Sequence, residues 1–265
     1  MHHSQGHNSD FSEEIVSCLY LIIKLIMKRF LLIALSLLSL EAIAQETRSY
    51  VTETDDYIAW RPDVKLTFDM FKKSTPNEKD TKAMQDDNRK CVPYLGFYRI
   101  LDVPKSRSGW KKGQFEKAYY CAMFSKHQSY MAERDTFDLQ IAQAQWDILE
   151  LGTRKSRMLL DSLQRQINSD SGGPVSGVVS IFYETASQKG EELYGMLSYS
   201  FFKEVILPRD REMYCKYREL LDKLLSDTAP YATSPEEAER FLLKKPLEKY
   251  LMPAISVIGD LRQKE

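Results

Sequence analysis

Three carboxylates stand close together in one short block, AERDTFDL, at residues 132–139. They are Glu133, Asp135 and Asp138, and a carboxylate can transfer a proton in catalysis or bind a cation. The simpler alternative is that each one faces solvent or pairs with a neighbouring Lys or Arg and has no catalytic role. Which of these holds depends on the element that carries the block.

The spacing of apolar residues predicts that this element is a long helix, at about 115–151 and resuming after Gly152. Its predicted apolar face comprises Phe115, Tyr119, Met123, Tyr130, Phe137, Ile141, Ala144, Ile148 and Leu151. On such a helix Ala132 and Thr136 are neighbours one turn apart, and Glu133 lies at the edge of the apolar face. Two histidines at these positions, with a Glu after the first, would bind zinc and polarise a water molecule. Ala132 offers a methyl group and Thr136 a weak hydroxyl ligand, so the block predicts no zinc site.

These residues resemble a bacterial family of domains of unknown function that are described as secreted zinc-dependent proteases. The helix of that family reads H-E-x-x-H-F-D followed by an aliphatic residue. The block matches this pattern at Glu133, Phe137, Asp138 and Leu139. LTFDMF (66–71) resembles the L-T-W-x-D-F opening of the family, and SGWKKG (108–113) resembles its Trp-Val-Lys approach to the helix. The resemblance covers about residues 50–190.

The chain also departs from the family at its ligand positions. The family's downstream ligand region, Y-x-x-E-T-x-H-G, is similar to YETASQKG (183–190), where Lys189 stands before the glycine and would repel zinc. The resemblance therefore implies an α+β, zincin-like fold that keeps the scaffold of the family without its chemistry. We expect no catalytic residue, no bound metal and no cofactor. The vestigial motif positions are Ala132, Glu133, Thr136, Asp138 and Lys189.

The start of the chain predicts export. Residues 27–44 have a basic start, a short apolar run and an Ala-Ile-Ala site at 42–44, which is typical of a secretory signal peptide. The alternative is a membrane anchor over 17–40, but three basic residues interrupt that run. Residues 1–26 have no targeting pattern and indicate a start codon assigned too far upstream. We expect a periplasmic or secreted protein with no transmembrane span after cleavage.

Removal of residues 1–44 leaves 34 basic and 34 acidic residues, so the mature chain is formally neutral. This balance predicts no nucleic-acid partner. His127 is then the only histidine, and a dyad with Cys121 or Cys215 would need a proximity that the sequence does not show. With Cys91 there are three cysteines, which either act as small hydrophobic residues or form one disulfide and one free thiol.

The remaining segments predict strands before helices, which favours the α+β class. We expect a degenerate zincin-like domain at 45–190 and a helical extension at 191–265. The predicted strands are 91–103 and 175–185, the predicted loop is 72–90, and the predicted helices are 191–207, 209–225 and 236–251. The last helix begins with the capping box SPEE (234–237) and has a predicted kink at Pro246.

Three functions are compatible with these patterns. The first is an exported, non-catalytic relative of a secreted zinc-dependent protease that serves as a binding or structural module for an unknown protein or envelope partner. The second is an unrelated exported helical interaction protein. The third is an active hydrolase that has replaced its zinc. A strand beside the central helix, with 183–190 close to Glu133, would favour the first.

Overall fold

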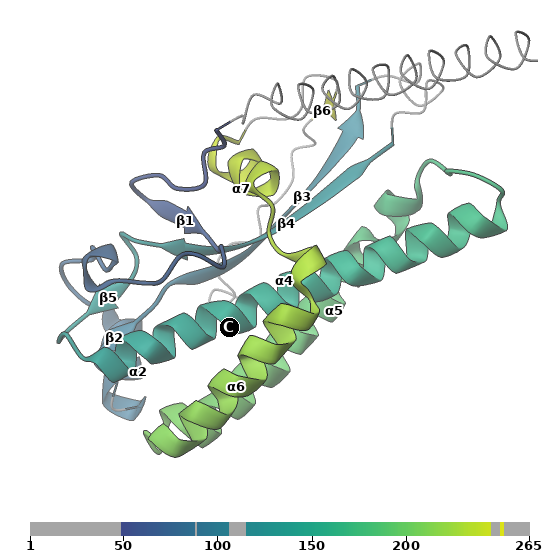
Figure 1. Ribbon diagram of the computed structural model, residues 1–265. Helices are drawn as coiled ribbons and strands as arrows, with labels where there is room; N and C mark the ends of the chain where they lie inside the picture. The colour runs from purple at the N-terminus through teal and green to yellow at the C-terminus, as the bar shows by residue number, and fades with distance from the viewer. Residues whose placement is uncertain (1–48, 88, 106–114, 245–249, 252–265) are drawn as a thin grey trace, which may run out of the picture. The chain divides into compact units, whose positions relative to one another are not determined.

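An antiparallel sheet in the order β1-β4-β3-β6 lies between helices in the computed structural model, which describes residues 49–87, 89–105, 115–244 and 250–251 (Figure 1). The strands of this sheet are β1 (Tyr57–Ala59), β3 (Leu95–Pro104), β4 (Lys117–Ser125) and β6 (Tyr250–Leu251). A second, small sheet pairs β2 (Cys91–Val92) with β5 (Tyr130–Met131). Helices and strands thus share the described chain, as the α+β prediction requires.

One long helix forms the centre of the helical layer. The helices are α2 (Glu78–Asp87), α4 (Thr136–Asp170), α5 (Val178–Phe201), α6 (Arg211–Asp227) and α7 (Pro235–Leu242). Short helical turns occur at Phe68–Met70, Phe202–Ile206 and Ala229–Tyr231, the second of them π-helical. Helix α5 returns along α4, and α6 crosses this pair (Figure 1).

The two faces of β4 are covered by different helices. Side chains alternate across a strand, so even-numbered and odd-numbered residues of β4 face opposite sides. The even-numbered residues Tyr120, Ala122 and Phe124 pack in a core with α4 and α5. The odd-numbered residues Tyr119, Cys121 and Met123 pack against Ala238 and Phe241 of α7. The sheet therefore lies between α4 on one side and α7 on the other.

A buried ion pair and two hydrogen bonds to a buried carboxylate fix α7 over the sheet. The Arg240 guanidinium donates to the Asp102 carboxylate of β3, with Nε–Oδ2 at 2.7 Å and both side chains buried. At the start of α7, the Glu150 carboxylate of α4 accepts from the Thr233 N–H at 2.8 Å and hydroxyl at 2.7 Å. Charges buried this deeply are stable only when paired, so the contacts fix the position of α7.

The predicted apolar face of the central helix is confirmed, but the predicted boundaries of that helix are wrong. Phe137, Ile141, Ala144 and Ile148 are all buried, in a cluster with the end of α5 and with α6. However, the helix begins at Thr136, and 117–125 is strand β4. Because β4 is buried on both faces, its apolar residues are nearly continuous, and such a run fits a helical period as well as a strand.

Three other elements differ from their predictions. Residues 178–185 belong to helix α5 and not to a strand, although the segment is rich in β-branched and aromatic residues. The predicted loop 72–90 contains α2, whose start is fixed by reciprocal hydrogen bonds between Asn77 and Asp80. The last helix ends at Leu242, and the predicted kink at Pro246 lies outside the described residues.

The other predictions agree with the structure where it describes the chain. The predicted strand 91–103 is extended but divides into β2 and β3, which belong to different sheets, and helix α6 and the capping box between Ser234 and Glu237 are confirmed. The predicted domain boundary at 190–191 falls inside α5. The upstream segment 1–26 and the signal peptide 27–44 lie outside the described residues. Within the described ranges, no helix is both long and apolar enough to cross a membrane.

Candidate functional site

The block AERDTFDL crosses the boundary between a turn and helix α4. Ala132 and Glu133 follow strand β5, and Asp135 is the N-cap of α4. The Asp135 carboxylate accepts from the N–H groups of Phe137 at 2.7 Å and Asp138 at 3.1 Å. Since α4 begins only at Thr136, Ala132 and Thr136 do not lie on one helical face. The spacing that would place two zinc ligands side by side is absent from this segment.

Glu133 is an exposed surface residue. Its Oε1 lies 3.0 Å from the Nζ of Lys90, and 66% of the Glu133 side chain is exposed. Exposed ion pairs of this kind contribute between zero and about 1 kcal/mol to stability, because water competes for both charges. In the described structure this carboxylate serves as a surface ion-pair partner.

Asp138 has a buried structural role. Its carboxylate accepts from both terminal nitrogens of Arg209, with Nη1–Oδ1 at 3.2 Å and Nη2–Oδ2 at 3.0 Å. The Arg209 guanidinium also lies over the ring of Phe137, 5.6 Å from its centroid. Arg209 has a φ of 54°, a conformation that costs a non-glycine residue about 1 kcal/mol. The ion pair therefore fixes the turn before α6 against the start of α4.

Lys189 lies far from the block. Its Nζ pairs with Glu192 at 2.7 Å on the exposed side of α5. Its neighbour Gly190 packs against Gly152 of α4. At about 1.5 Å per residue, Gly152 lies about 24 Å along the helix from Thr136. Segment 183–190 is therefore not close to Glu133, and the arrangement that would favour a zincin-like site is not found.

The cysteines and the histidine are also separate. Cys91, Cys121 and Cys215 are all free thiols; the first two are buried and the third is exposed. Burial raises the pKa of the Cys91 and Cys121 thiols, which makes them poor nucleophiles. His127 is exposed, with its Nε2 3.6 Å from the Asp56 carboxylate. Among the described residues, no three His, Cys, Asp or Glu side chains are grouped so as to hold a metal ion.

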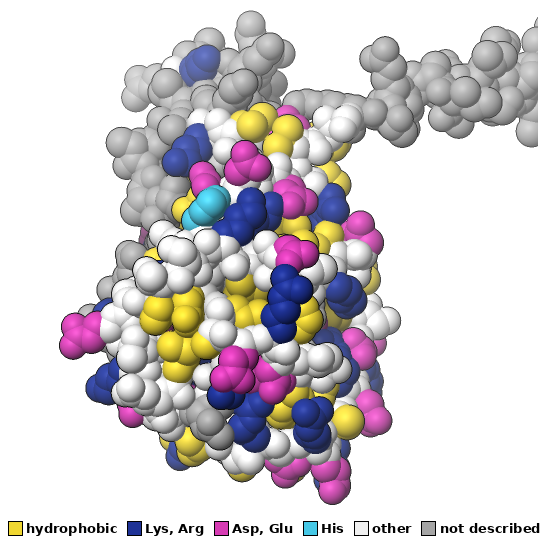
Figure 2. Space-filling view, turned by 90° about the vertical axis from the view of Figure 1, so that its left-hand side faces the viewer, with side chains coloured by type: hydrophobic (Ala, Val, Ile, Leu, Met, Phe, Trp, Pro, Cys, Tyr) yellow, Lys and Arg dark blue, Asp and Glu magenta, His cyan; other side chains and the backbone are white. Residues whose placement is uncertain are grey.

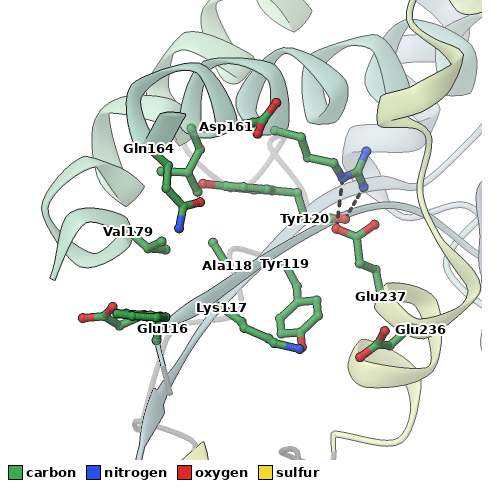
Figure 3. A pocket seen from close by; sticks show the side chains of 13 residues that line it. Glu116, Lys117, Ala118, Tyr119, Tyr120, Asp161, Gln164, Val179, Glu236 and Glu237 are labelled. Carbon is green, nitrogen blue, oxygen red and sulfur yellow. Dashed lines mark hydrogen bonds and ion pairs between the residues drawn. The ribbon is translucent and has the colours of Figure 1, made fainter. Parts of the chain in front are cut away.

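A cavity lies elsewhere, beside the first half of β4 (Figure 3). Its volume is about 560 Å³, within the range of about 300–1,000 Å³ that is usual for ligand sites. We call it the edge groove. Its lining residues are Phe115, Glu116, Lys117, Ala118, Tyr119, Tyr120, Arg157, Leu160, Asp161, Gln164, Val179, Glu236 and Glu237.

The edge groove follows an open edge of the main sheet. Strand β1 pairs with β4 only at Met123–Ser125, so over 117–122 no described strand pairs with β4 on the side away from β3. The Ala122 carbonyl on this side accepts the N–H of Trp60 at 2.9 Å, and the Tyr120 carbonyl accepts from Arg157. Alternate residues of a strand direct their backbone groups the same way, so Ala118 also faces this edge.

The two walls of the groove belong to α4 and α7. Leu160, Asp161 and Gln164 come from α4 and Glu236 and Glu237 from α7. In Figure 3, Ala118 and Tyr120 point towards α4, and Lys117 and Tyr119 point to the opposite side. Because residues from both faces of β4 line the cavity, it surrounds the edge of the strand and does not cover one face.

Carboxylates outnumber cations in the lining. The acidic residues are Glu116, Asp161, Glu236 and Glu237, and the basic residues are Lys117 and Arg157. Arg157 is fully engaged: its Nε donates to Glu237 at 3.0 Å and its Nη1 to the Tyr231 carbonyl at 2.7 Å. Glu116 is buried and accepts from the Gly177 N–H at 3.1 Å, so it caps the start of α5. The groove is thus a net acidic site.

A smaller cavity of about 340 Å³ lies between α4 and α6. Its central carboxylate, Asp147, accepts from Trp60 Nε1 at 2.8 Å and pairs with Arg218 Nη1 at 2.6 Å. The Arg154 guanidinium lies 4.8 Å from the centroid of a Trp60 ring and pairs with Glu150. These charges are paired within the protein, so the cavity offers a ligand less than the edge groove does.

Sequence reasoning did not find the edge groove. Residue spacing predicts a helix over 115–120, and no sequence pattern points to Asp161, Gln164 or Glu236 as functional residues. The only signal for the strand that lines the groove is its aromatic residues, Tyr119, Tyr120 and Phe124. No family model, curated protein or solved structure matches this chain.

Proposed function

We propose that this chain is an exported, non-catalytic binding module of the cell envelope whose partner binds in the edge groove. The observation that carries the proposal is the open edge of β4, which lines a cavity of about 560 Å³ between α4 and α7. A sheet edge with unpaired backbone groups is a common docking site for another chain. The predicted signal peptide supports export to the periplasm or beyond.

The structural use of the motif residues supports a non-catalytic role. Asp135 caps α4, Asp138 pairs with Arg209, and Glu133 pairs with Lys90 at the surface. Descent from a secreted zinc-dependent protease with a zincin-like fold is part of the proposal and rests on the sequence resemblance alone. In that case the turn at Ala132 would be a later change, which ended the helical spacing that places two zinc ligands side by side.

The exposed side of the helical layer gives a second candidate site, as expected for a helical interaction protein. Met196 and Tyr199 of α5 are 59% and 60% exposed, and Leu220 of α6 is 44% exposed. The Nζ of Lys203 lies 4.7 Å from the centroid of the Tyr199 ring. Exposed apolar side chains on helices often mark contact surfaces. Figure 2 shows one side of the molecule, where acidic and basic side chains are interspersed with hydrophobic groups.

Site-specific photo-crosslinking in the producing cell distinguishes the two surfaces. A photoreactive phenylalanine replaces Gln164 in the edge groove, Met196 on the helical face, or the exposed residue Glu219 of α6 as a control. We expect a discrete crosslinked adduct from position 164 and none from 196 or 219. An adduct from 196 alone would support the second candidate, and the absence of any specific adduct would argue against both.

Export is tested separately by N-terminal sequencing of protein from the same cells. We expect the mature chain to begin at Gln45. A mature protein that retains residues 1–26 would contradict export by this signal.

A further inference from the structure

We infer that the partner of the edge groove is an extended, basic peptide segment that adds to β4 as a further antiparallel or parallel strand. This inference rests on the proposed function and names the chemistry of its partner. Three features carry it: the edge of β4 with which no described strand pairs, the walls on both sides of that edge, and the charge of the lining.

The backbone of β4 supplies the attachment. Ala118 and Tyr120 direct their N–H groups to the open edge, and Ala118 also directs its carbonyl there. The Tyr120 carbonyl is occupied by Arg157, which limits the free edge to residues 117–120. At about 3.3 Å per residue this edge is about 13 Å long, enough for a strand of about four residues. Hydrogen bonds to such an edge give affinity without selecting a sequence.

The walls select an extended chain over a helix. A strand added at the edge would lie about 4.8 Å from β4 and would continue the sheet between α4 and α7. Leu160 and Val179 give the α4 side an apolar surface beside Ala118. A helix is about 10 Å wide and presents no unpaired backbone groups along its length, so it could not satisfy this edge.

The charge of the lining selects basic side chains. Successive side chains of a strand point to opposite sides, so one would face α4 and the next would face α7. The α4 wall carries Asp161, and the α7 wall carries Glu236, which makes no ion pair with any described residue; Lys117 of β4 lies on the same side as Glu236. Asp161 already pairs with Arg165 at 2.9 Å, and one of its oxygens accepts from Tyr231. Two adjacent basic residues in the peptide would therefore place one cation near each wall.

The test uses the mature chain and synthetic peptides. The probe is the fluorescein-labelled peptide Thr-Val-Thr-Lys-Arg-Thr-Val-Thr, and the charge control replaces Lys-Arg by Glu-Glu. A third peptide keeps the Lys-Arg pair and carries an N-methyl group on each of its six central residues, which removes the N–H groups of both edges there. Binding is measured by fluorescence polarisation at low and physiological salt.

We expect the Lys-Arg peptide to bind at least about tenfold more tightly than either control peptide. Asp161→Asn and Glu236→Gln should each weaken it severalfold and reduce its salt dependence. Ala118→Pro should weaken it about tenfold, because proline removes an N–H that makes no bond to β3. Circular dichroism and thermal unfolding establish whether each variant is folded. If Ala118→Pro does not fold, Asp161→Asn and Glu236→Gln provide the test.

Equal binding of the three peptides, or no binding of the Lys-Arg peptide, would overturn the inference. Tight binding that N-methylation and Ala118→Pro leave unchanged would also overturn strand addition. The crosslinking result at position 164 does not depend on these peptides. An adduct there together with failure of the peptides would keep the proposed function and reject its extended, basic partner.

Discussion

Gly190 of α5 and Gly152 of α4 touch backbone to backbone. A Cβ atom on Gly190 would lie 2.5 Å from the Gly152 carbonyl oxygen, and one on Gly152 would lie 2.9 Å from the Gly190 carbonyl oxygen. Real Cβ contacts are essentially never this short, so the two helices cross here only because both residues lack a side chain. The glycine of YETASQKG thus has a packing role, and Gly152 marks a helix crossing and not a break in α4.

Gly190→Ala should therefore destabilise the protein. The added methyl group would meet the α4 backbone, which cannot move aside as a flexible side chain could, and overpacking of this kind costs about 1–3 kcal/mol or more. Gly195→Ala is the matched control, because Gly195 lies in the same helix with nothing within 4 Å of an added Cβ. It should be neutral or stabilising by up to about 1 kcal/mol. Urea unfolding measures both, and equal effects would contradict the close crossing.

Asp138→Asn should lower the free energy of unfolding by about 2–3 kcal/mol. The substitution removes the negative partner of Arg209 at a site where the Asp138 side chain is only 1% exposed. Glu133→Gln is the control from the same block, and its exposed pair with Lys90 predicts a loss below about 1 kcal/mol. Thermal and urea unfolding are the measurements. A larger loss for Glu133→Gln than for Asp138→Asn would show that the roles of the two carboxylates are reversed.

The carboxylate of Asp135, the N-cap of α4, predicts that the protein loses stability at low pH. Burial raises the pKa of Asp135, but hydrogen bonds from the Asp138 and Phe137 N–H groups and the charges of Arg209 and Arg211 lower it below the ordinary value of 3.8. The unfolded chain therefore takes up this proton at a higher pH than the folded chain. The stabilisation is complete above pH 3.8 and is lost as the pH falls through the folded value.

Asp135→Asn tests this linkage, because asparagine caps a helix as well as aspartate does but does not titrate. We expect near-native stability at about pH 6 and a smaller loss than wild type between about pH 4 and pH 2. Asp135→Ser should behave in the same way, since serine is also a good N-cap. An unchanged acid-dependent loss in both variants would show that other groups control this range.

The parts of the fold that the sequence predicts well are those with a local pattern. Phe137, Ile141, Ala144 and Ile148 recur at helical spacing and form one buried face of α4, although Trp146 and Leu149 are buried on another face of the same helix. In the SPEE segment, Ser234 and Glu237 are sufficient to form the capping box, because both bonds are local. Local patterns of this kind need no knowledge of what packs against them.

Tertiary contacts decide the parts that were mispredicted. Strand β4 has apolar residues on both faces only because α4 and α7 cover both, and the sequence does not show that α7 returns to it. The edge groove depends on β1 ending its pairing at Met123, so that no described strand pairs with Ala118 on the side away from β3. Helix α2 has few apolar residues, and its start depends on the contacts of Asn77 and Asp80. The site was therefore beyond prediction from residue spacing.

The thiols should differ sharply in reactivity. Cys91 and Cys121 are at most 1% exposed, and burial raises the pKa of both thiols, whereas Cys215 lies exposed on α6. At about pH 8 the native mature chain should react quickly with a thiol reagent at one site. Cys215→Ser should abolish that fast reaction, and denaturation should reveal two thiols in the variant. Two fast thiols in the native protein would contradict the burial of Cys91 or Cys121.

Histidine substitution tests the turn at the start of α4. Ala132 precedes the helix, and its N–H donates to the Lys90 carbonyl at 2.8 Å, which ties it to β2. We therefore expect Ala132→His/Thr136→His to gain no measurable zinc affinity by isothermal titration calorimetry.

The positive control is Glu212→His/Lys216→His, because Glu212 and Lys216 form an exposed i,i+4 pair on α6. Two histidines there lie one turn apart and should bind zinc weakly but measurably. Zinc binding by the 132/136 variant at least as tight as that of the control would show that the segment adopts the helical spacing. That result would restore the metal-site geometry implied by the sequence resemblance.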